Sequence, residues 1–290
     1  MSQPARESRP WQPFGAALIS VTLWSSAFVG IRAATRTIAP GSLALGRLLI
    51  GSVLLGVLLL RQGANRPTRR DLGSLGLAGL LWFGLYNVAL NTAERAVDAG
   101  TAAMVVNIAP LMIMALAAMF LHEHLPGRLL VGGVVAFVGV IVIGLANRTG
   151  NAPWSGVVLC VVATASSAAG VVAQKPVLAH LSALQVTWTC CAIGALCCLP
   201  YAPGLLRDLR TASALDLGWM GYLGGFPTSV AFTTWAYALA RSSASHLAAM
   251  AYLVPPLTIG MSWLILHEVP DTVAVLGGGL CLVGVYLARR

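Results

Sequence analysis

Charged side chains are scarce in this sequence of 290 residues. Asp, Glu, Lys and Arg together make up 9% of the residues, whereas 58% are hydrophobic. A soluble domain carries about 25% charged residues. Ionised groups are costly in hydrocarbon, and backbone polar groups must be paired there, which helices do within one segment. The composition therefore excludes an ordinary soluble protein and predicts an all-α polytopic membrane protein.

Ten apolar stretches are long enough to cross a bilayer, which takes about 20 residues of helix. They lack the polar face at helical spacing that a soluble helical bundle would need. The predicted spans are residues 14–31, 42–60, 72–92, 100–121, 129–145, 154–173, 184–200, 217–239, 244–266 and 272–288. The connections are short, so we expect no extramembrane domain.

The net charge of +9 does not indicate nucleic-acid binding, because the basic residues lie in short loops and tails rather than on one face. Cytoplasmic loops of membrane proteins are enriched in Lys and Arg. Placing the N-terminus inside puts eleven basic residues in the cytoplasm against six outside, with the loop from Arg61 to Arg70 as the densest group. We expect a multi-pass protein of the plasma or inner membrane, both termini cytoplasmic, with residues 1–13 as a retained tail rather than a cleaved signal peptide.

Metal-binding patterns are also missing. The six cysteines fall inside predicted spans, so we interpret them as packing residues rather than a disulfide framework. The pairs at 190–191 and 197–198 have no nearby His or carboxylate. The run His122-Glu123-His124 is no zinc site either, because adjacent residues on a helix point in different directions. We expect no metal and no cofactor.

The sequence repeats itself at an offset of 145. Residues 101–145 match 246–290. Pro110 aligns with Pro255, and Leu121-His122-Glu123 aligns with Leu266-His267-Glu268. Each copy has five predicted spans, so the second copy must enter the membrane from the opposite side, as in the inverted repeats of secondary transporters. We expect a first repeat over 14–146, a connector at 147–153 and a second repeat over 154–288.

Glycines mark the fifth span of each repeat. Small residues let helices approach closely in lipid. Gly132, Gly133 and Gly139 recur as Gly277, Gly278 and Gly284. We interpret these two spans as a scaffold pair within one chain. A dimer contact is the alternative, so both monomer and homodimer remain open.

Prolines interrupt the fourth span of each repeat, at Pro110 and at Pro255-Pro256. Proline removes a helical hydrogen bond and clashes with the preceding turn, so both helices should bend or break there. In a transporter such breaks serve as hinges or expose backbone beside the substrate. A static kink is the alternative.

Polar and aromatic side chains recur in the first, third and fourth spans of each repeat. These helices should line a central cavity, because polar groups in a membrane face a cavity or one another. The predicted substrate-binding residues are Trp24, Ser25, Asn87, Asn91, Asn107, Ser166, Trp235 and Tyr252. Hydrogen bonds between helices are the competing interpretation for the serines and asparagines, and interfacial anchoring is that for the tryptophans.

Charge inside the predicted spans is nearly absent. Arg47 is about one turn into the second span, where its side chain could reach the surface; a substrate-binding role is the alternative. Glu123 and Glu268 close the fourth spans and would lie near opposite surfaces. We predict that these glutamates are gates. Helix termination, or an ion pair such as one with Arg128, is the alternative.

Together these features resemble the EamA family of the drug/metabolite transporter superfamily over almost the whole chain. The supporting stretches are residues 23–28, 47–50, 107–111 and 120–123 in the first copy and 252–257 and 266–268 in the second. The family usually has glycine before the glutamate at 123 and 268, whereas this chain has His122 and His267.

The resemblance implies ten helices in two inverted five-helix repeats around a central cavity, with alternating access and export of amino acids or related amphipathic solutes. The partners would be a small-molecule solute and membrane lipid, without nucleic acid. An intramembrane enzyme acting on a lipid-like substrate is an alternative, but no catalytic constellation is present, so we expect no enzyme. A drug or lipid exporter and a channel remain further alternatives.

Overall fold

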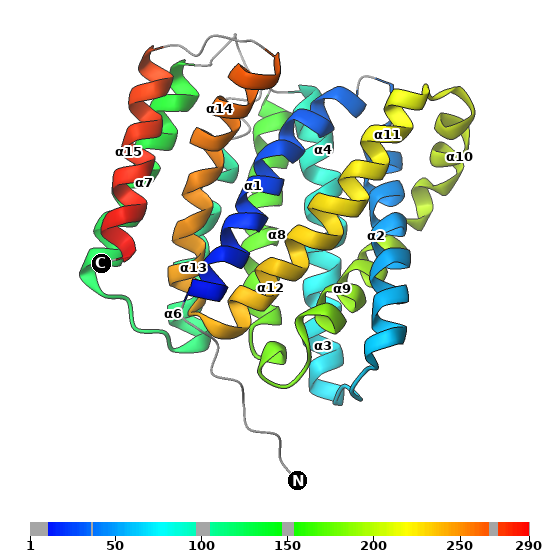
Figure 1. Cartoon of the computed structure of the whole chain (residues 1–290), viewed down its shortest axis with the longest axis horizontal. Helices are drawn as coiled ribbons and strands as arrows, with labels where there is room; N and C mark the ends of the chain where they lie inside the picture. Colours follow the sequence, from blue (N-terminus) through cyan, green and yellow to red (C-terminus); the bar gives the residue numbers. More distant parts are fainter. Residues whose placement is uncertain (1–10, 36, 97–104, 147–153, 267–271, 290) are drawn as a thin grey trace.

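The chain forms one bundle of helices in the computed structural model (Figure 1). The residues that the structure describes are 11–35, 37–96, 105–146, 154–266 and 272–289. Within these ranges every regular element is helical. Apolar side chains such as Leu54, Val134 and Leu276 are exposed along the outer helices, as expected for surfaces in contact with lipid.

The first repeat consists of α1 (Trp11–Ala34), α2 (Pro40–Gln62), α3 (Arg69–Ala78), η1 (Gly79–Leu85), α4 (Tyr86–Ala96), α6 (Ala109–Leu121) and α7 (Gly127–Ala146). The second consists of α8 (Trp154–Gln174), η2 (Val177–Ala179), α9 (Ala183–Cys197), η3 (Leu199–Tyr201), α10 (Ala202–Thr211), α11 (Ala214–Leu223), η4 (Gly224–Ala231), α12 (Phe232–Arg241), α13 (Ala244–Met250), η5 (Ala251–Leu253), α14 (Val254–Leu266) and α15 (Thr272–Arg289).

The helices α3 and α11 begin with the same capping box, 145 residues apart. Thr68 accepts from the Asp71 backbone N–H while the Asp71 carboxylate accepts from the Thr68 N–H, and Ser213 and Asp216 repeat this arrangement. Such a box pairs two backbone donors that a helix start leaves unsatisfied. The repeat seen in the sequence therefore extends to this span.

Both of these helices then pass through a π-helical turn, η1 and η4, at the same offset. The backbone approaches a neighbouring helix there. A Cβ atom placed on Gly79 would lie 2.7 Å from Ile193 Cβ, and one placed on Gly224 would lie 2.7 Å from Ile50 Cβ. Such turns often occur at functional sites in helices.

The two ends of the described chain lie on one face of the bundle, where α1 begins and α15 ends (Figure 1). We call this the terminal face. The chain also reaches it between α2 and α3, where Asn65 bonds Gln185, and after α8, where His180 contacts Asp71. The start of α2 lies on the opposite face, beside Arg95, which donates to the carbonyls of Thr35 and Ile38.

The scaffold pair predicted from glycine is present, because α7 and α15 lie side by side (Figure 1). A Cβ atom on Gly132 would lie 2.6 Å from the Gly284 carbonyl oxygen, and one on Gly284 would lie 2.5 Å from the Gly132 carbonyl oxygen. Only glycine permits this approach of two backbones.

Continuous helices account for only part of the predicted spans. Among the described residues, three helical stretches are long and apolar enough to cross a membrane, at Pro40–Gln62, Arg69–Arg95 and Val158–Ala179. A fourth results if Ala183–Cys197 and Leu199–Thr211, which meet at 52°, count as one bent span. Between the predicted spans 184–200 and 217–239 the structure thus contains a further helix, α10.

Candidate functional site

A cavity of about 870 Å³, its mouth included, lies between the two repeats. Both repeats contribute to its wall. The lining residues are Trp24, Ala27, Phe28, Ile31, Arg47, Trp82, Tyr86, Leu90, Val106, Asn107, Ala109, Pro110, Ile113, Ser167, Val171, Phe232, Trp235, Ala251 and Val254. The mostly apolar wall with a few polar groups is typical of small-ligand sites.

Aromatic rings from both repeats form one side of this cavity. The ring centroid of Trp24 lies 4.8 Å from that of Trp235 and 5.4 Å from that of Phe232. Trp82 lies 4.8 Å from Phe232. These separations are within the range of favourable aromatic contacts, so the rings form a continuous apolar wall.

Arg47 is the charged side chain in this wall. It is 4% exposed, and its Nε donates to Thr228 Oγ1 at 2.9 Å. The sequence suggested that Arg47 could reach the surface, but α2 starts at Pro40, which places Arg47 seven residues, or about 10 Å, into the helix. The guanidinium therefore lies inside the bundle and not at its surface.

Two further polar side chains of the wall were predicted from the sequence. Asn107 is 6% exposed and lies just before α6. Trp235 is 2% exposed, and its indole nitrogen has no hydrogen-bond partner among the described residues. The cavity thus combines apolar walls with hydrogen-bond donors.

The predicted hinges coincide with breaks in helix geometry. Asn107 and Ile108 form a turn, and α6 begins with Pro110 in its first two positions. In the second repeat the 3₁₀ turn η5 separates α13 from α14, which begins just before Pro255 and Pro256. The prediction that both helices bend or break at these prolines is confirmed. Pro110 and Pro255 are buried in the bundle.

Five predicted binding residues do not line this cavity, because they bond within the bundle or lie in its core. Ser25 donates to the carbonyls of Val21 and Val254, and Ser166 to that of Ala163. Asn87 donates to the Phe83 carbonyl at 2.7 Å, and Asn91 to that of Pro40. Tyr252 is fully buried against α7 and α15 in the cluster of Ala136, Val140, Cys281 and Val285.

The wall also contains Arg47, Trp82, Tyr86, Phe232 and Ser167, which were not among the predicted binding residues. A charged residue two turns inside an apolar span was a usable signal for Arg47. Trp82, Tyr86 and Phe232 carried no comparable signal, because aromatic residues are common throughout such helices.

Glu123 links the two repeats at the terminal face. Its carboxylate accepts from the Ala244 and Ser245 backbone N–H groups at 2.7 and 3.0 Å and from Ser245 Oγ at 2.7 Å. This holds the first turn of α13, where a negative charge is favourable. The predicted counterpart, Glu268, lies outside the described residues.

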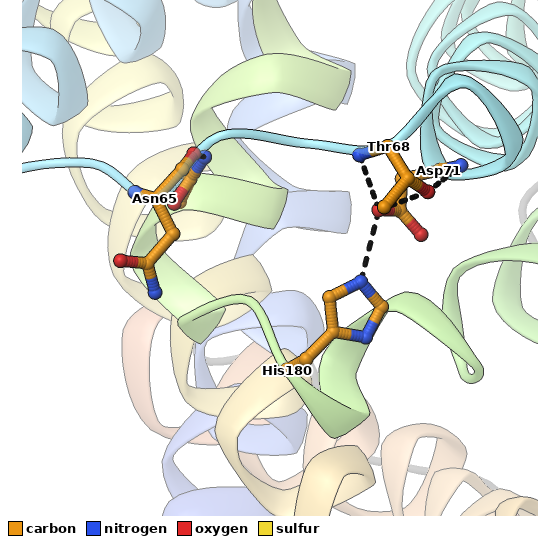
Figure 2. A network of polar contacts seen from close by, with 5 residues as sticks. Asn65, Thr68, Asp71 and His180 are labelled. Atoms are coloured by element: carbon orange, nitrogen blue, oxygen red, sulfur yellow. Dashed lines mark hydrogen bonds and ion pairs between the residues drawn. The ribbon is translucent and has the colours of Figure 1, made fainter.

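Further polar contacts tie the repeats together on the terminal face. Figure 2 shows Asp71 Oδ2 beside His180 Nε2, at 2.9 Å. The Asn65 N–H donates to the Gln185 side chain, which donates back to the Asn65 carbonyl. Within the second repeat, the Lys175 ammonium donates to the carbonyls of Leu239 and Ser242 on the same face. This face is therefore closed by direct bonds.

Comparison with known proteins identifies relatives over nearly the whole chain. The model of the EamA-like transporter family matches residues 14–145 and 154–290. A protein of Streptantibioticus cattleyicolor named "Probable terminal-alkyne amino-acid exporter" is 35% identical, over 95% of this chain and 92% of its own. The "Uncharacterized transporter YdfC" of Bacillus subtilis is 31% identical, over 92% and 87%. One solved crystal structure shares the fold, with a TM-score of 0.78, 20% identity and 97% of both chains covered.

Proposed function

We propose, from the premise that this chain belongs to the EamA-like transporter family, that it is a secondary exporter of small amphipathic metabolites, most closely amino acids or compounds like them. Its similarity to transporters over almost its full length supports a multi-pass membrane transporter. The amino-acid-like substrate, the export direction and the absence of enzymatic activity are parts of the proposal.

The single observation that carries the proposal is the cavity between the repeats. A transporter must hold its solute at a site that both halves of the molecule can expose in turn. Trp24, Asn107 and Pro110 come from the first repeat, and Phe232, Trp235 and Val254 from the second. A movement of one repeat against the other would therefore remodel this wall.

The positions of the bonds between repeats suggest which face is closed in this state. Arg47, Leu90 and Val106 lie in the parts of their helices remote from the terminal face, whereas Glu123, the Asp71–His180 pair and the Asn65–Gln185 pair connect the repeats at the terminal face. If the terminal face is cytoplasmic, as the distribution of basic residues predicts, the structure is the state closed to the cytoplasm.

The proposed cycle breaks the Glu123 contacts and moves α6 and α13 about the proline-linked breaks. Glu123 is then the inner gate, with Glu268 as its proposed partner near the other surface, and Pro110, Pro255 and Pro256 are the hinges. The chain needs no cofactor or metal for this movement, because the solute gradient, or a coupled ion gradient, drives it.

Counterflow in vesicles tests the proposal. Purified protein is reconstituted into vesicles, and the candidate solutes are apolar L-amino acids. The vesicles are loaded with one unlabelled solute, and the entry of the same solute in labelled form is followed. A carrier gives saturable uptake that rises transiently above equilibrium, whereas a channel gives neither saturation nor counterflow. Absence of flux for every solute, with turnover of a lipid, would favour the enzyme alternative.

Asn107→Ala should lower this flux at least about tenfold without loss of folded protein, because removal of a buried polar contact to a ligand costs about 1.5 kcal/mol. Ser25→Ala is the matched control, since Ser25 is buried but does not line the cavity. Equal flux through both variants would remove Asn107 from the site.

A further inference from the structure

We infer that the cavity binds the carboxylate of its solute at Arg47, with the indole N–H of Trp235 as a second donor. The solute class is a small monocarboxylate with an apolar or aromatic arm. This inference rests on the proposed function and specifies the substrate of the same cavity.

The geometry of Arg47 suits a carboxylate. Its Nε bonds Thr228, so the two terminal nitrogens form the edge of the guanidinium that can hold two carboxylate oxygens side by side. The side chain lines the cavity although it is almost fully buried. A permanent charge in this position attracts an anionic group from solvent, and the low dielectric strengthens the contact.

A comparison of equivalent helix contacts in the two repeats shows that the scaffold does not require this arginine. A Cβ atom on Gly224 would lie 2.9 Å from the Arg47 carbonyl oxygen, and one on Gly79 would lie 2.9 Å from that of Cys190. Cys190 is thus the structural equivalent of Arg47. The same helix junction is built with a buried thiol in one repeat and a guanidinium in the other, so a role beyond packing explains the charge.

Glu94 on α4 is a carboxylate close enough to Arg47 for their charges to attract each other. A purely structural ion pair between these two residues is therefore the competing explanation, and the two explanations differ in one respect. Replacing Glu94 by Gln removes a rival for the guanidinium, so a carboxylate solute should bind more tightly to that variant. A structural pair predicts only loss of stability.

Trp235 provides an independent indication. Its indole nitrogen lacks an acceptor among the described residues, whereas the Trp188 indole nitrogen donates to the Ser52 carbonyl at 3.1 Å. A buried donor without an acceptor destabilises the protein. The cost is removed when a bound ligand supplies an oxygen, and Trp235 lines the same cavity as Arg47.

The rest of the wall defines the arm of the solute. Trp24, Trp82 and Phe232 present aromatic surfaces, and Ile31, Leu90 and Ile113 add aliphatic ones. These residues favour an apolar chain or a single ring and offer no charged partner for a second charged group on that arm.

Binding to purified protein in detergent tests the inference. The probes are 3-phenylpropionate with its amide and L-phenylalanine with its amide, measured by titration calorimetry and by thermal shift. Wild-type protein should bind at least one acid about tenfold or more tightly than its amide, because hydrogen bonds to charged groups are the strong ones. Arg47→Gln should abolish that preference, and Arg47→Lys should restore part of it.

Arg95→Gln, Cys190→Ala and Trp188→Phe serve as controls for folding and for a general effect of charge, and Trp235→Phe tests the second donor. Arg95→Gln removes an arginine that bonds backbone carbonyls away from the cavity, and Cys190→Ala alters the symmetric position; both should keep the acid preference. Trp235→Phe should weaken acid binding, whereas Trp188→Phe should not. Arg47→Lys and Trp235→Phe keep the test decisive if Arg47→Gln does not fold.

The inference is overturned if acid and amide bind wild-type protein equally, if neither acid binds, or if Arg47→Lys and Trp235→Phe both keep the wild-type preference. The proposed transport function fails separately, when vesicles show no saturable counterflow of any solute. Counterflow of amines or neutral solutes that does not depend on Arg47 would refute the carboxylate site and leave the transporter intact.

Discussion

The junction of α2 with η4 and the junction of α9 with η1 occupy equivalent places in the two repeats. Their backbones approach alike, through Gly224 and Gly79. Their side chains differ, because Arg47 bonds Thr228 in the first junction whereas Cys190 and Phe83 are buried in the second. A duplicated scaffold can thus carry a site that is not duplicated, and a small solute needs only one charged anchor.

The largest expected effect is a difference in transport rate between variants of the two junctions. Arg47→Gln should reduce acid counterflow at least about tenfold, since it removes a charge-assisted contact, while Cys190→Ala should change it less than about twofold. Initial rates at several solute concentrations measure both. Similar losses in the two variants would mean that the junctions serve packing alone.

The next effect should be shared by the two junctions. Gly79→Ala and Gly224→Ala each place a methyl group against an isoleucine and a backbone carbonyl, so each should destabilise the protein by about 1–3 kcal/mol. Thermal unfolding in detergent gives the comparison, with Gly218→Ala, where a Cβ would meet nothing within 4 Å, as the control. A large difference between the first two would argue against equivalent junctions.

Removing the charge of Glu123 tests the closed face. Glu123→Gln keeps one acceptor oxygen but weakens the bonds to Ala244 and Ser245, at a cost of about 1–2 kcal/mol to the closed state. A cysteine is placed in the cavity wall, and a thiol reagent is added from the terminal face. The reagent should react with this cysteine faster in the variant than in the protein with Glu123. Unchanged reactivity, with Glu123→Asp as the conservative comparison, would count against a gate.

Replacement of the two indoles should have opposite effects on stability without ligand. Trp235→Phe removes an unpaired buried donor and should be neutral or stabilising by about 1 kcal/mol, whereas Trp188→Phe breaks a bond to Ser52 and should destabilise by a similar amount. Melting temperatures decide. Destabilisation by Trp235→Phe would show that its N–H already has an acceptor.

The smallest effect should be at the Asp71–His180 pair. The His180 side chain is 49% exposed, so solvent screens its interaction with Asp71 and the pair should contribute little. His180→Ala should therefore lower the melting temperature only slightly, while Asp71→Ala, which also removes the Thr68 capping box, should lower it more. Equal effects would mean that the cap contributes nothing.

Much of the architecture could be predicted from the sequence, because its signals are local. The offset of 145 fixed the repeat, the glycines of α7 and α15 predicted their contact, and the prolines predicted the breaks before α6 and α14. Each depends on a property of the residue itself, such as a missing side chain or a missing N–H.

The residues that line the cavity could be predicted only in part. Trp24, Asn107 and Trp235 line it, but Ser25, Asn87 and Ser166 satisfy their polar groups on backbone carbonyls within the bundle. A hydroxyl or amide that bonds its own preceding turn has the same sequence pattern as one that faces a ligand. The depth of Arg47 was missed because it depends on where α2 starts.

Access to the cavity from the two sides of the membrane tests the central claim most directly. Ala27→Cys, in a background without the six native cysteines, places a thiol in the cavity wall, and its reaction with a membrane-impermeant reagent is measured from each side of oriented vesicles. The account predicts reaction from both sides, a shift in the ratio of the two rates with Glu123→Gln, and protection by a bound acid. Reaction from one side alone, unaffected by either change, would contradict alternating access through this cavity.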